Sequence, residues 1–305
     1  IVLSFTFDLS RKFQTYDYRS FLKKLLGKGW VFYEITYLIG LVLVISVLAS
    51  ASGNLLNEAL NISNIYGIIL MILLIGIFSY FGSKVVMKFL SYWSIALYFV
   101  FLILIISIGS IFSENIILNF NISENKPNWL INGFKYAAYN VGIVPAMLFC
   151  LKDLKTRKEA IVSGIIGAFL AMIPGFMIYF SLLSHYPEIK SEIIPTNFLF
   201  NKLGSDSFKI LFQIILFGTF VETGLGLIHG FNERIASWLM EKKIILSGIY
   251  RFIISSFIMV ICIFFAEQFG LISLIAEGYG TLTWAYWIIF VFPVIFIGLK
   301  KIILK

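Results

Sequence analysis

The side chains most suited to proton or ion chemistry lie in the segment ILFGTFVETGLGLIHGFNERI, residues 215–235. Glu222 lies near its middle and is followed by Thr223, while His229 and Glu233 come seven and eleven residues after Glu222. On a helix these three ionisable groups fall near one face. A carboxylate in apolar surroundings must be neutral, paired or hydrated. Glu222, Thr223 and His229 therefore form a candidate coupling-ion or proton site, with a structural hydrogen bond between helices as the alternative.

The same three ionisable groups are also considered as metal ligands. A zinc site made from Glu222, His229 and Glu233 would need its ligands much closer together than seven and eleven residues place them on a helix. No metal and no cofactor is expected.

The stretch KYAAYNVGIVPAML, residues 135–148, is unusually polar for its apolar surroundings. In an unbroken helix Gly142 would cost about 1 kcal/mol relative to Ala, and Pro145 would remove the hydrogen bond to residue 141. With Asn140, these residues predict a break around Tyr139–Val144. A simple proline kink is one explanation. The other is a discontinuous helix whose backbone binds a solute; the candidate solute-binding residues are then Ala138, Tyr139, Asn140, Val141 and Gly142.

Glu277 is a further candidate ionisable group, in LIAEGYGTLTW, residues 274–284. Gly278 and Gly280 interrupt the apolar pattern beside it. This indicates either a second interrupted membrane span or an ordinary loop that runs into a helix at Thr281. In the first case Glu277 joins the coupling-ion candidates.

The composition indicates what kind of protein positions these groups. Of 305 residues, 60% are hydrophobic and 13% are charged, whereas soluble domains have about a quarter charged residues. Each of several apolar segments approaches the ~20 residues that a membrane helix needs. Continuous apolar runs favour helices over barrel strands. The eight predicted spans are Trp30–Leu48, Ile65–Phe81, Phe89–Phe112, Ile131–Leu151, Ala160–Leu183, Phe208–Phe231, Ile244–Phe265 and Leu271–Leu299.

The basic residues of the connections alternate between the two sides of the predicted membrane. One set of connections and ends holds Arg11, Lys12, Arg19, Lys23, Lys24, Lys28, Lys84, Lys88, Lys152, Lys155, Arg157, Lys158, Arg234, Lys242, Lys243, Lys300, Lys301 and Lys305. The other set holds only Lys126, Lys190 and Lys202. Cytoplasmic loops carry the Lys and Arg excess, so both ends of the chain are expected in the cytoplasm. The net charge of +8 then reflects this bias and attraction to anionic lipid, and no nucleic-acid partner is expected.

The first residues, IVLSFTF, are apolar, and a basic segment follows them. We interpret Ile1–Phe7 as the cytoplasmic end of a span whose beginning is missing, so that the chain is truncated at its N-terminus. Residues Leu9–Leu26 are predicted to form one amphipathic surface helix with Phe13, Tyr16, Phe21 and Leu25 as its membrane face. An ordinary solvated linker is the alternative. The small residues of ASASGN, residues 49–54, indicate close helix packing.

Three motifs together resemble the YkvI-like bacterial membrane proteins: YNVGIVPAML, ETGLGLIHGFNERI, and FGLISLIAEGYGTLTWAYWIIFVFPVI near the end. That group is described as amino-acid permeases similar to the amino acid–polyamine–organocation superfamily, which has the LeuT-type fold. The resemblance implies ten spans in two inverted repeats. The eight predicted spans would be the third to tenth, with residues 1–112 as the remainder of the first repeat and 131–305 as the second. It also places a helix break at Ile131–Leu151 and Glu222 beside a coupling-ion site, while the unwound first span of the family lies outside this sequence.

The chain is therefore expected to be an all-α polytopic protein of the bacterial cytoplasmic membrane, and not an enzyme. The leading hypothesis is a secondary transporter for an amino acid or similar small solute, driven by protons or sodium. The alternative is a membrane receptor or scaffold that binds a solute without moving it. An embedded enzyme is disfavoured because the sequence holds neither a nucleophile–base pair nor a metal motif.

Overall fold

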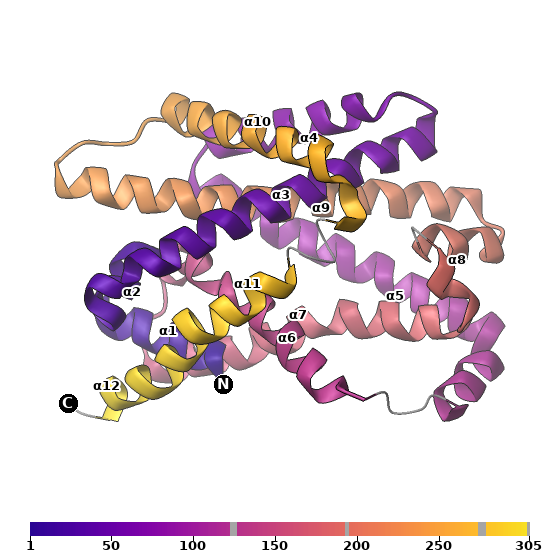
Figure 1. The fold of residues 1–305 in the computed structure, drawn as a ribbon, viewed down its shortest axis with the longest axis horizontal. Coiled ribbons are helices and arrows are strands. Elements are labelled where there is room, and N and C mark those ends of the chain that lie inside the picture. Colours follow the sequence, from indigo (N-terminus) through magenta and orange to yellow (C-terminus); the bar gives the residue numbers. More distant parts are fainter. Residues whose placement is uncertain (123–126, 193–194, 274–278, 304–305) are drawn as a thin grey trace.

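A computed structural model describes residues 1–122, 127–192, 195–273 and 279–303, which are helical almost throughout and contain no β-strand (Figure 1). The α-helices are α1 (Val2–Phe13), α2 (Tyr18–Leu26), α3 (Trp30–Leu60), α4 (Asn64–Tyr80), α5 (Ser83–Ile122), α6 (Trp129–Gly142), α7 (Arg157–Leu183), α8 (Pro195–Leu203), α9 (Asp206–Glu241), α10 (Gly248–Ser273), α11 (Tyr279–Tyr286) and α12 (Leu299–Ile303). Short 3₁₀ segments are η1 (Gly27–Gly29), η2 (Val144–Leu151) and η3 (Glu188–Ser191). Two π-helical segments, η5 (Trp287–Val291) and η6 (Val294–Gly298), continue α11 toward α12.

The long helices carry the apolar segments that the sequence predicted as spans. Within the described residues, five helices are long and apolar enough to cross a membrane, and the bent pair α6 and η2 makes a sixth candidate. The apolar parts of α4 and α10 are shorter. The all-helical membrane class is therefore confirmed, while the number of eight spans stays a prediction.

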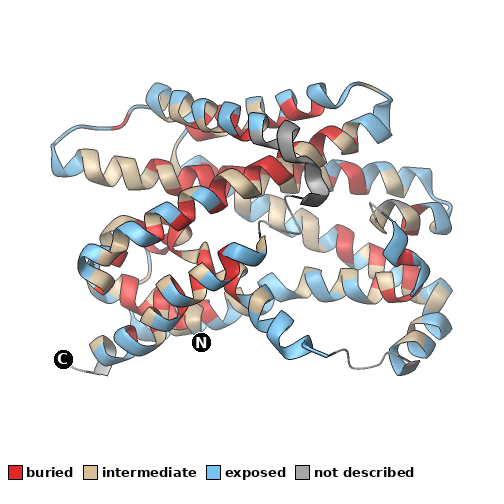
Figure 2. Cartoon of the chain, viewed as in Figure 1, coloured by how far each residue is buried: buried red, intermediate tan, exposed pale blue. Residues whose placement is uncertain are grey.

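The long helices run side by side along the longest axis of the molecule (Figure 1). Helix α3 contacts α4, α9 and α10, helix α5 contacts α7 and α9, and α1 lies along α7. Buried residues concentrate along α3, in the middle of α9 and on the inner sides of α1, α2 and α11, whereas the outer faces of the bundle are exposed (Figure 2). Those outer faces are rich in exposed large apolar side chains, as expected of helices that contact lipid.

The small residues predicted to allow close helix packing do so between α3 and α4. A Cβ added to Gly67 would lie 2.4 Å from the backbone oxygen of Ser52 and 3.0 Å from the Cα of Gly53. The two backbones therefore touch at this point, which only a residue without a side chain allows.

The single amphipathic helix predicted over Leu9–Leu26 is wrong. Helix α1 ends at Phe13, Gln14 adopts a left-handed conformation with φ 51°, and Asp17 starts α2 by accepting a hydrogen bond from the Ser20 backbone N–H at 2.9 Å. Phe21 and Leu25 pack in the protein core, so they form no membrane face. The apolar period correctly predicts that this face avoids water, but protein, and not lipid, covers it.

Residues Ile1–Phe7 lie at the start of α1. Ser4 donates to the Ile161 backbone oxygen of α7 at 3.2 Å, and a Cβ on Gly164 would lie 2.5 Å from the Ser4 Cα. That these residues end a further span stays a prediction.

Helix α5 is longer than its predicted apolar segment. The prediction Phe89–Phe112 stops where Phe112 departs from helical geometry, with φ −120° and ψ 25°, and the helix resumes after this kink to Ile122. The apolar run thus marked the straight part of the helix, and the polar residues after it did not end the hydrogen-bonded backbone.

Candidate functional site

The predicted helix break is present, and it lies within the predicted range of Tyr139–Val144. Helix α6 ends at Gly142, Ile143 forms a turn, and η2 begins at Val144, with a bend of 46° between the two axes. Pro145 explains the break, because it donates no backbone hydrogen bond and disfavours helical geometry at the residue before it. Residues 139–142 complete α6 and are not unwound, so the break occupies only the C-terminal part of the predicted range.

The backbone at the break is bonded to the interior of the protein. The Tyr33 hydroxyl of α3 donates to the Gly142 carbonyl oxygen at 2.8 Å. On its other side Gly142 lies against the ring of Tyr286, where an added Cβ would be 2.3 Å from Cγ. A carbonyl freed by the break therefore already has a partner, and the glycine is required by the close approach of the ring.

The predicted solute-binding residues differ in burial and in their contacts. Ala138 is buried, and Tyr139 is half-buried against the rings of Tyr136 and Tyr279. Asn140 is exposed, and its side-chain amide donates to the Tyr136 carbonyl of its own helix at 2.7 Å. Asn140 thus satisfies its polarity locally. Val141 is half-buried and packs against the core.

Sequence reasoning missed a cluster of buried tyrosines beside the break. Tyr18, Tyr33, Tyr37 and Tyr286 are fully or almost fully buried, and Tyr33 and Tyr37 stack with ring centroids 6.0 Å apart. Tyr37 donates to the Leu227 carbonyl of α9 at 2.6 Å. Within the described part of the chain the Tyr286 hydroxyl is buried without a hydrogen-bond partner. The i, i+4 spacing of Tyr33 and Tyr37 was the available signal, because it places both rings on one helix face.

Glu222 lies half-buried between α9 and α5. Ser94 of α5 donates to its Oε1 at 2.7 Å, and the same hydroxyl lies 2.8 Å from the Leu90 carbonyl oxygen. One helical turn before Glu222, Gly218 lets the Trp93 ring approach α9, where an added Cβ would be 1.7 Å from Cζ2. A neutral hydroxyl is therefore the observed partner of this carboxylate. Thr223 is half-buried beside it.

His229 and Glu233 lie together, two turns further along α9. The Nε2 atom of His229 lies 3.0 Å from Ser83 Oγ and 3.6 Å from Glu233 Oε1. Glu233 also pairs with Arg251 of α10, Nη1 to Oε1 at 2.8 Å, and with Lys152, Nζ to Oε2 at 3.4 Å. The structure thus brings His229 and Glu233 together and leaves Glu222 with a separate partner.

Glu277 lies outside the described residues. Among the residues that are described, no group of three or more His, Cys, Asp or Glu side chains could hold a metal ion.

A cavity of about 560 Å³ opens beside Glu233. The linker between α1 and α2 lines one side, and the last turns of α9 line the other. Its charged lining residues are Asp17, Lys24, Lys152, Glu233 and Glu241. Through this cavity the Glu233 side chain of α9 has access to water.

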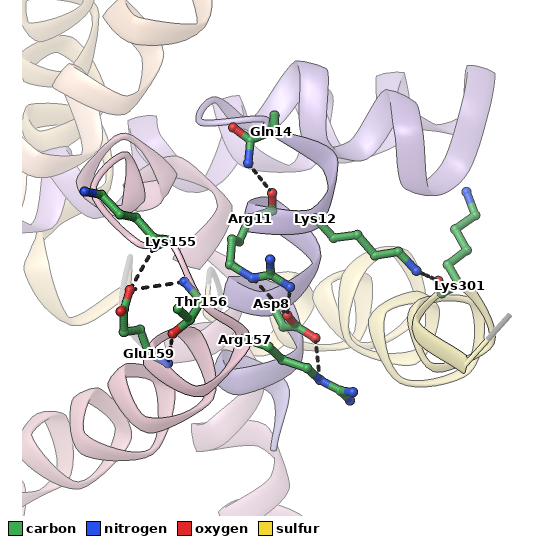
Figure 3. A network of polar contacts seen from close by, with 9 residues as sticks. All are labelled: Asp8, Arg11, Lys12, Gln14, Lys155, Thr156, Arg157, Glu159 and Lys301. Carbon is green, nitrogen blue, oxygen red and sulfur yellow. Dashed lines mark hydrogen bonds and ion pairs between the residues drawn. The ribbon is translucent and has the colours of Figure 1, made fainter. Parts of the chain in front are cut away.

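Ion pairs join the helices at this end of the molecule, which we call the basic end. Asp8 is buried and accepts from Arg11 at 2.7 Å, and its other oxygen lies 3.2 Å from Arg157 of α7 (Figure 3). Glu34 of α3 pairs with Arg234 of α9 at 2.6 Å. In the same region Lys12 donates to the Lys301 backbone oxygen (Figure 3). Residues far apart in the sequence are thus joined by charge at this end.

Comparison with known proteins gives one informative match. No family model matches the chain, and neither does any solved structure. The chain is 24% identical over 213 residues to the uncharacterized membrane protein YkvI of Bacillus subtilis (strain 168). The match covers 66% of this chain and 57% of that protein. The chain is therefore similar to a YkvI-like membrane protein over most of its length, which agrees with the apolar helices described above.

Proposed function

We propose that this protein is a secondary transporter, a permease that moves an amino acid or similar small solute across the cytoplasmic membrane. The observation that carries the proposal is the 46° break between α6 and η2 inside a bundle of apolar helices. Non-helical backbone at membrane depth is tolerated where protein buries it or where it lines a cavity, and transporters use such broken helices to bind their solutes. The interior Glu222 and His229 add titratable groups of the kind that link solute movement to an ion gradient.

The proposed architecture has eight spans arranged as a LeuT-type pair of inverted repeats. Residues 1–112 form the remainder of the first repeat, and residues 131–305 form the second. The solute site then lies at the break, with Ala138–Gly142 on one side of it, and Tyr33 must release the Gly142 carbonyl when the solute takes its place. Replacing Tyr33 with Phe removes that hydrogen bond and should change the affinity for the solute more than the stability of the fold.

Uptake measurements test the function directly. Proteoliposomes holding the protein are given a uniformly ¹⁴C-labelled mixture of the standard amino acids under an inward proton or sodium gradient. A transporter accumulates at least one component with saturable kinetics. Saturable binding without accumulation would instead support the receptor function, and neither result is expected from protein-free vesicles.

The proposed orientation places both ends of the described chain in the cytoplasm. It is tested by labelling with a membrane-impermeant thiol reagent in a Cys150→Ser background, because Cys150 is the exposed native cysteine. Ser191→Cys should react from outside, and Lys23→Cys should react only after the membrane is opened; both positions are exposed. Ser10 is unsuitable for this test because it is fully buried. The reverse pattern contradicts the orientation.

The coupling role of Glu222 has its own test. Glu222→Gln keeps the shape and the hydrogen bond from Ser94 but removes the change of charge. If Glu222 couples, this variant should exchange solute across the membrane yet lose gradient-driven accumulation. Ser94→Ala is the matched control, since it removes the observed donor and leaves the carboxylate. Full accumulation by Glu222→Gln would leave Glu222 with a structural role only.

A further inference from the structure

Trp30, the first residue of α3, lies between two arginines that come from different helices. The guanidinium carbon of Arg19 of α2 is 5.5 Å from the centroid of the Trp30 ring, and that of Arg234 of α9 is 5.7 Å from it. Such cations are attracted to the face of an indole ring. Each arginine is also held by a carboxylate, Arg19 by Glu241 at 2.8 Å and Arg234 by Glu34 at 2.6 Å. Helices α2, α3 and α9 therefore meet at a tryptophan ring with fixed cations around it.

The same combination of rings and cations continues to the end of α9. Trp238 is one turn after Arg234, and the ammonium group of Lys242, which caps the helix, lies 4.0 Å from the centroid of the Trp238 ring. On α2, Lys23 is one turn after Arg19, so both side chains lie on one helix face. We call this the tryptophan–cation surface, and its residues are Arg19, Lys23, Trp30, Arg234, Trp238 and Lys242.

This surface carries more positive charge than its carboxylates balance. Glu34 and Glu241 are each already paired with an arginine. Lys23 and Lys242 are exposed, and their ammonium groups form no ion pair with any described residue. A surplus of exposed cations attracts an anionic partner, and these two lysines have hydrogen-bond donors to give it.

The tryptophan–cation surface lies where the exposed apolar face of α3 begins. Directly after Trp30, the side chains of Val31, Phe32 and Ile35 are exposed. Directly before it, the segment Gly27–Gly29 holds a lysine between two glycines. Tryptophan is enriched at the boundary between the hydrocarbon of a membrane and water. A partner at this boundary therefore meets cations on one side and apolar side chains on the other.

We propose that the tryptophan–cation surface binds an anionic phospholipid in the leaflet at the basic end. The lipid phosphate accepts hydrogen bonds from Lys23 and Lys242. Arg19 and Arg234 keep their carboxylate partners and add positive potential, which attracts anionic headgroups. The bound lipid joins α2 to the end of α9. The inference depends on the membrane class of the protein and not on the proposed transport.

The apolar side chains next to the cations decide which anion fits. The acyl chains of a phospholipid lie along Val31 and Ile35, which a soluble phosphate or an acidic protein would leave uncovered. A zwitterionic phospholipid has the same acyl chains, but its own cationic group compensates the charge of its phosphate. An anionic lipid such as phosphatidylglycerol matches both halves of the surface.

Two double variants with the same change of charge test the position of the site. Lys23→Gln/Lys242→Gln removes the two unpaired ammonium groups of the surface. Lys155→Gln/Lys158→Gln is the matched control, because both lysines are exposed at the basic end but lie at the start of α7. Each purified protein is titrated with phosphatidylglycerol in a neutral detergent, and native mass spectrometry counts the bound lipid.

The first variant should bind phosphatidylglycerol about 25-fold more weakly than the wild type, since each lysine beside an anionic lipid contributes about fivefold. The control should stay within about twofold of the wild type, because the attraction falls off within a Debye length. The wild type should also prefer phosphatidylglycerol to phosphatidylcholine. Equal losses in the two variants, or no preference between the two lipids, would overturn the site.

Soluble competitors test the identity of the occupant. Glycerophosphoglycerol, which is the headgroup without acyl chains, and a polyglutamate peptide are each added to the wild type with bound lipid. Neither should displace the lipid at an equal concentration. Displacement by the free headgroup would make this a site for soluble phosphates, and displacement by polyglutamate would make it a surface for an acidic protein. Either result would overturn the lipid.

A second measurement uses the wild type alone. In nanodiscs of phosphatidylcholine, added phosphatidylglycerol should slow the deuterium exchange of α2 and of the last turn of α9, because the bound lipid joins them. The exchange of α8 should not change. Equal effects on all three segments, or none on α2, would overturn the proposal.

Discussion

The two ends of the bundle are held together by different interactions. At the basic end, ion pairs join α1 to α7, α2 and α3 to α9, and α9 to α10 and to Lys152, which follows η2. The Glu34–Arg234 pair at 2.6 Å is an example. At the opposite end, which we call the distal end, α8 and the adjoining parts of α5 and α9 form a separate apolar cluster (Figure 1). Phe212 is central to that cluster, with its ring centroid 4.6 Å from Phe200 and 5.6 Å from Phe101.

This difference has a physical consequence. Apolar contact depends little on pH or salt, because close packing of uncharged side chains supplies its energy. Ion pairs can exchange partners with water, with a ligand or with a proton, and salt screens those that are partly exposed. The basic end is therefore the end at which a change of protonation can alter the structure, and the distal end is the better anchor.

The largest expected effect tests the close packing of α5 against α9 toward the distal end. Gly218→Ala would place its Cβ 1.7 Å from the Trp93 ring, so we expect a loss of about 3 kcal/mol, the upper part of the range for overpacked cores. The melting temperature in detergent measures it. Gly109→Ala on α5 is the matched control, since nothing lies within 4 Å of its Cβ position, and it should be neutral or stabilising. Equal melting temperatures for the two variants would show that the close contact is unimportant.

The next effect tests an ion pair at the basic end. Arg234→Met leaves the Glu34 carboxylate, 13% exposed, without its guanidinium. We expect a loss of about 2 kcal/mol, below the 3–5 kcal/mol found for fully buried pairs because both groups keep some contact with water. Adding Glu34→Gln should recover part of this loss in a double-mutant cycle. Strictly additive losses would mean that the two charges do not interact.

A smaller effect compares helix caps at the two ends. At the basic end Thr156 accepts from the Glu159 N–H at 3.1 Å while Glu159 accepts from the Thr156 N–H at 3.2 Å (Figure 3). Thr156→Ala should cost about 1 kcal/mol. Ser205→Ala at the distal end should cost less, because its single bond from the Phe208 N–H is 3.4 Å long. Chemical denaturation of both variants checks the order, and a larger loss for Ser205→Ala would reverse it.

The smallest effect is the pH response of the distal end. His185 lies between the rings of Phe112 and Phe198, and burial, followed by the charge of Lys202, lowers its pKa, while Glu188 opposes the shift. The unfolded chain therefore binds the proton more readily, and the stability that His185 contributes above pH ~6.5 is lost as the pH falls. His185→Gln should reduce the fall in melting temperature between pH 7.5 and 5. An unchanged slope would show that another group controls it.

Most of the fold was predictable because long apolar runs have few alternatives to helix. The break at Ile143 was also predictable, since Pro145 acts locally. The hydrogen bond that occupies the break was not predictable: Tyr33 and Gly142 are 109 residues apart, and only packing brings them together.

The candidate site shows the same division between local and tertiary information. Helical spacing correctly placed His229 beside Glu233, four residues on. It could not reveal that Ser94 would reach Glu222, because α5 is a separate helix. Likewise, the apolar period of residues 9–26 shows that one face avoids water, but the period of Phe21 and Leu25 is the same whether lipid or protein covers it.

The contact between Gly142 and Tyr286 connects the helix break to the last helical region of the chain. Helix α6 is tied to the last helical region twice, by this close contact and by the bond from Trp287 Nε1 to the Phe134 carbonyl at 3.2 Å. We therefore expect a rotation at Ile143 to move η5, and with it η6 and α12, which continue the same helical region. At the other end of this region, Lys301 of α12 donates to the Leu25 carbonyl of α2 at 3.3 Å. A small angular change at the break is thus expected to displace α2 at the basic end.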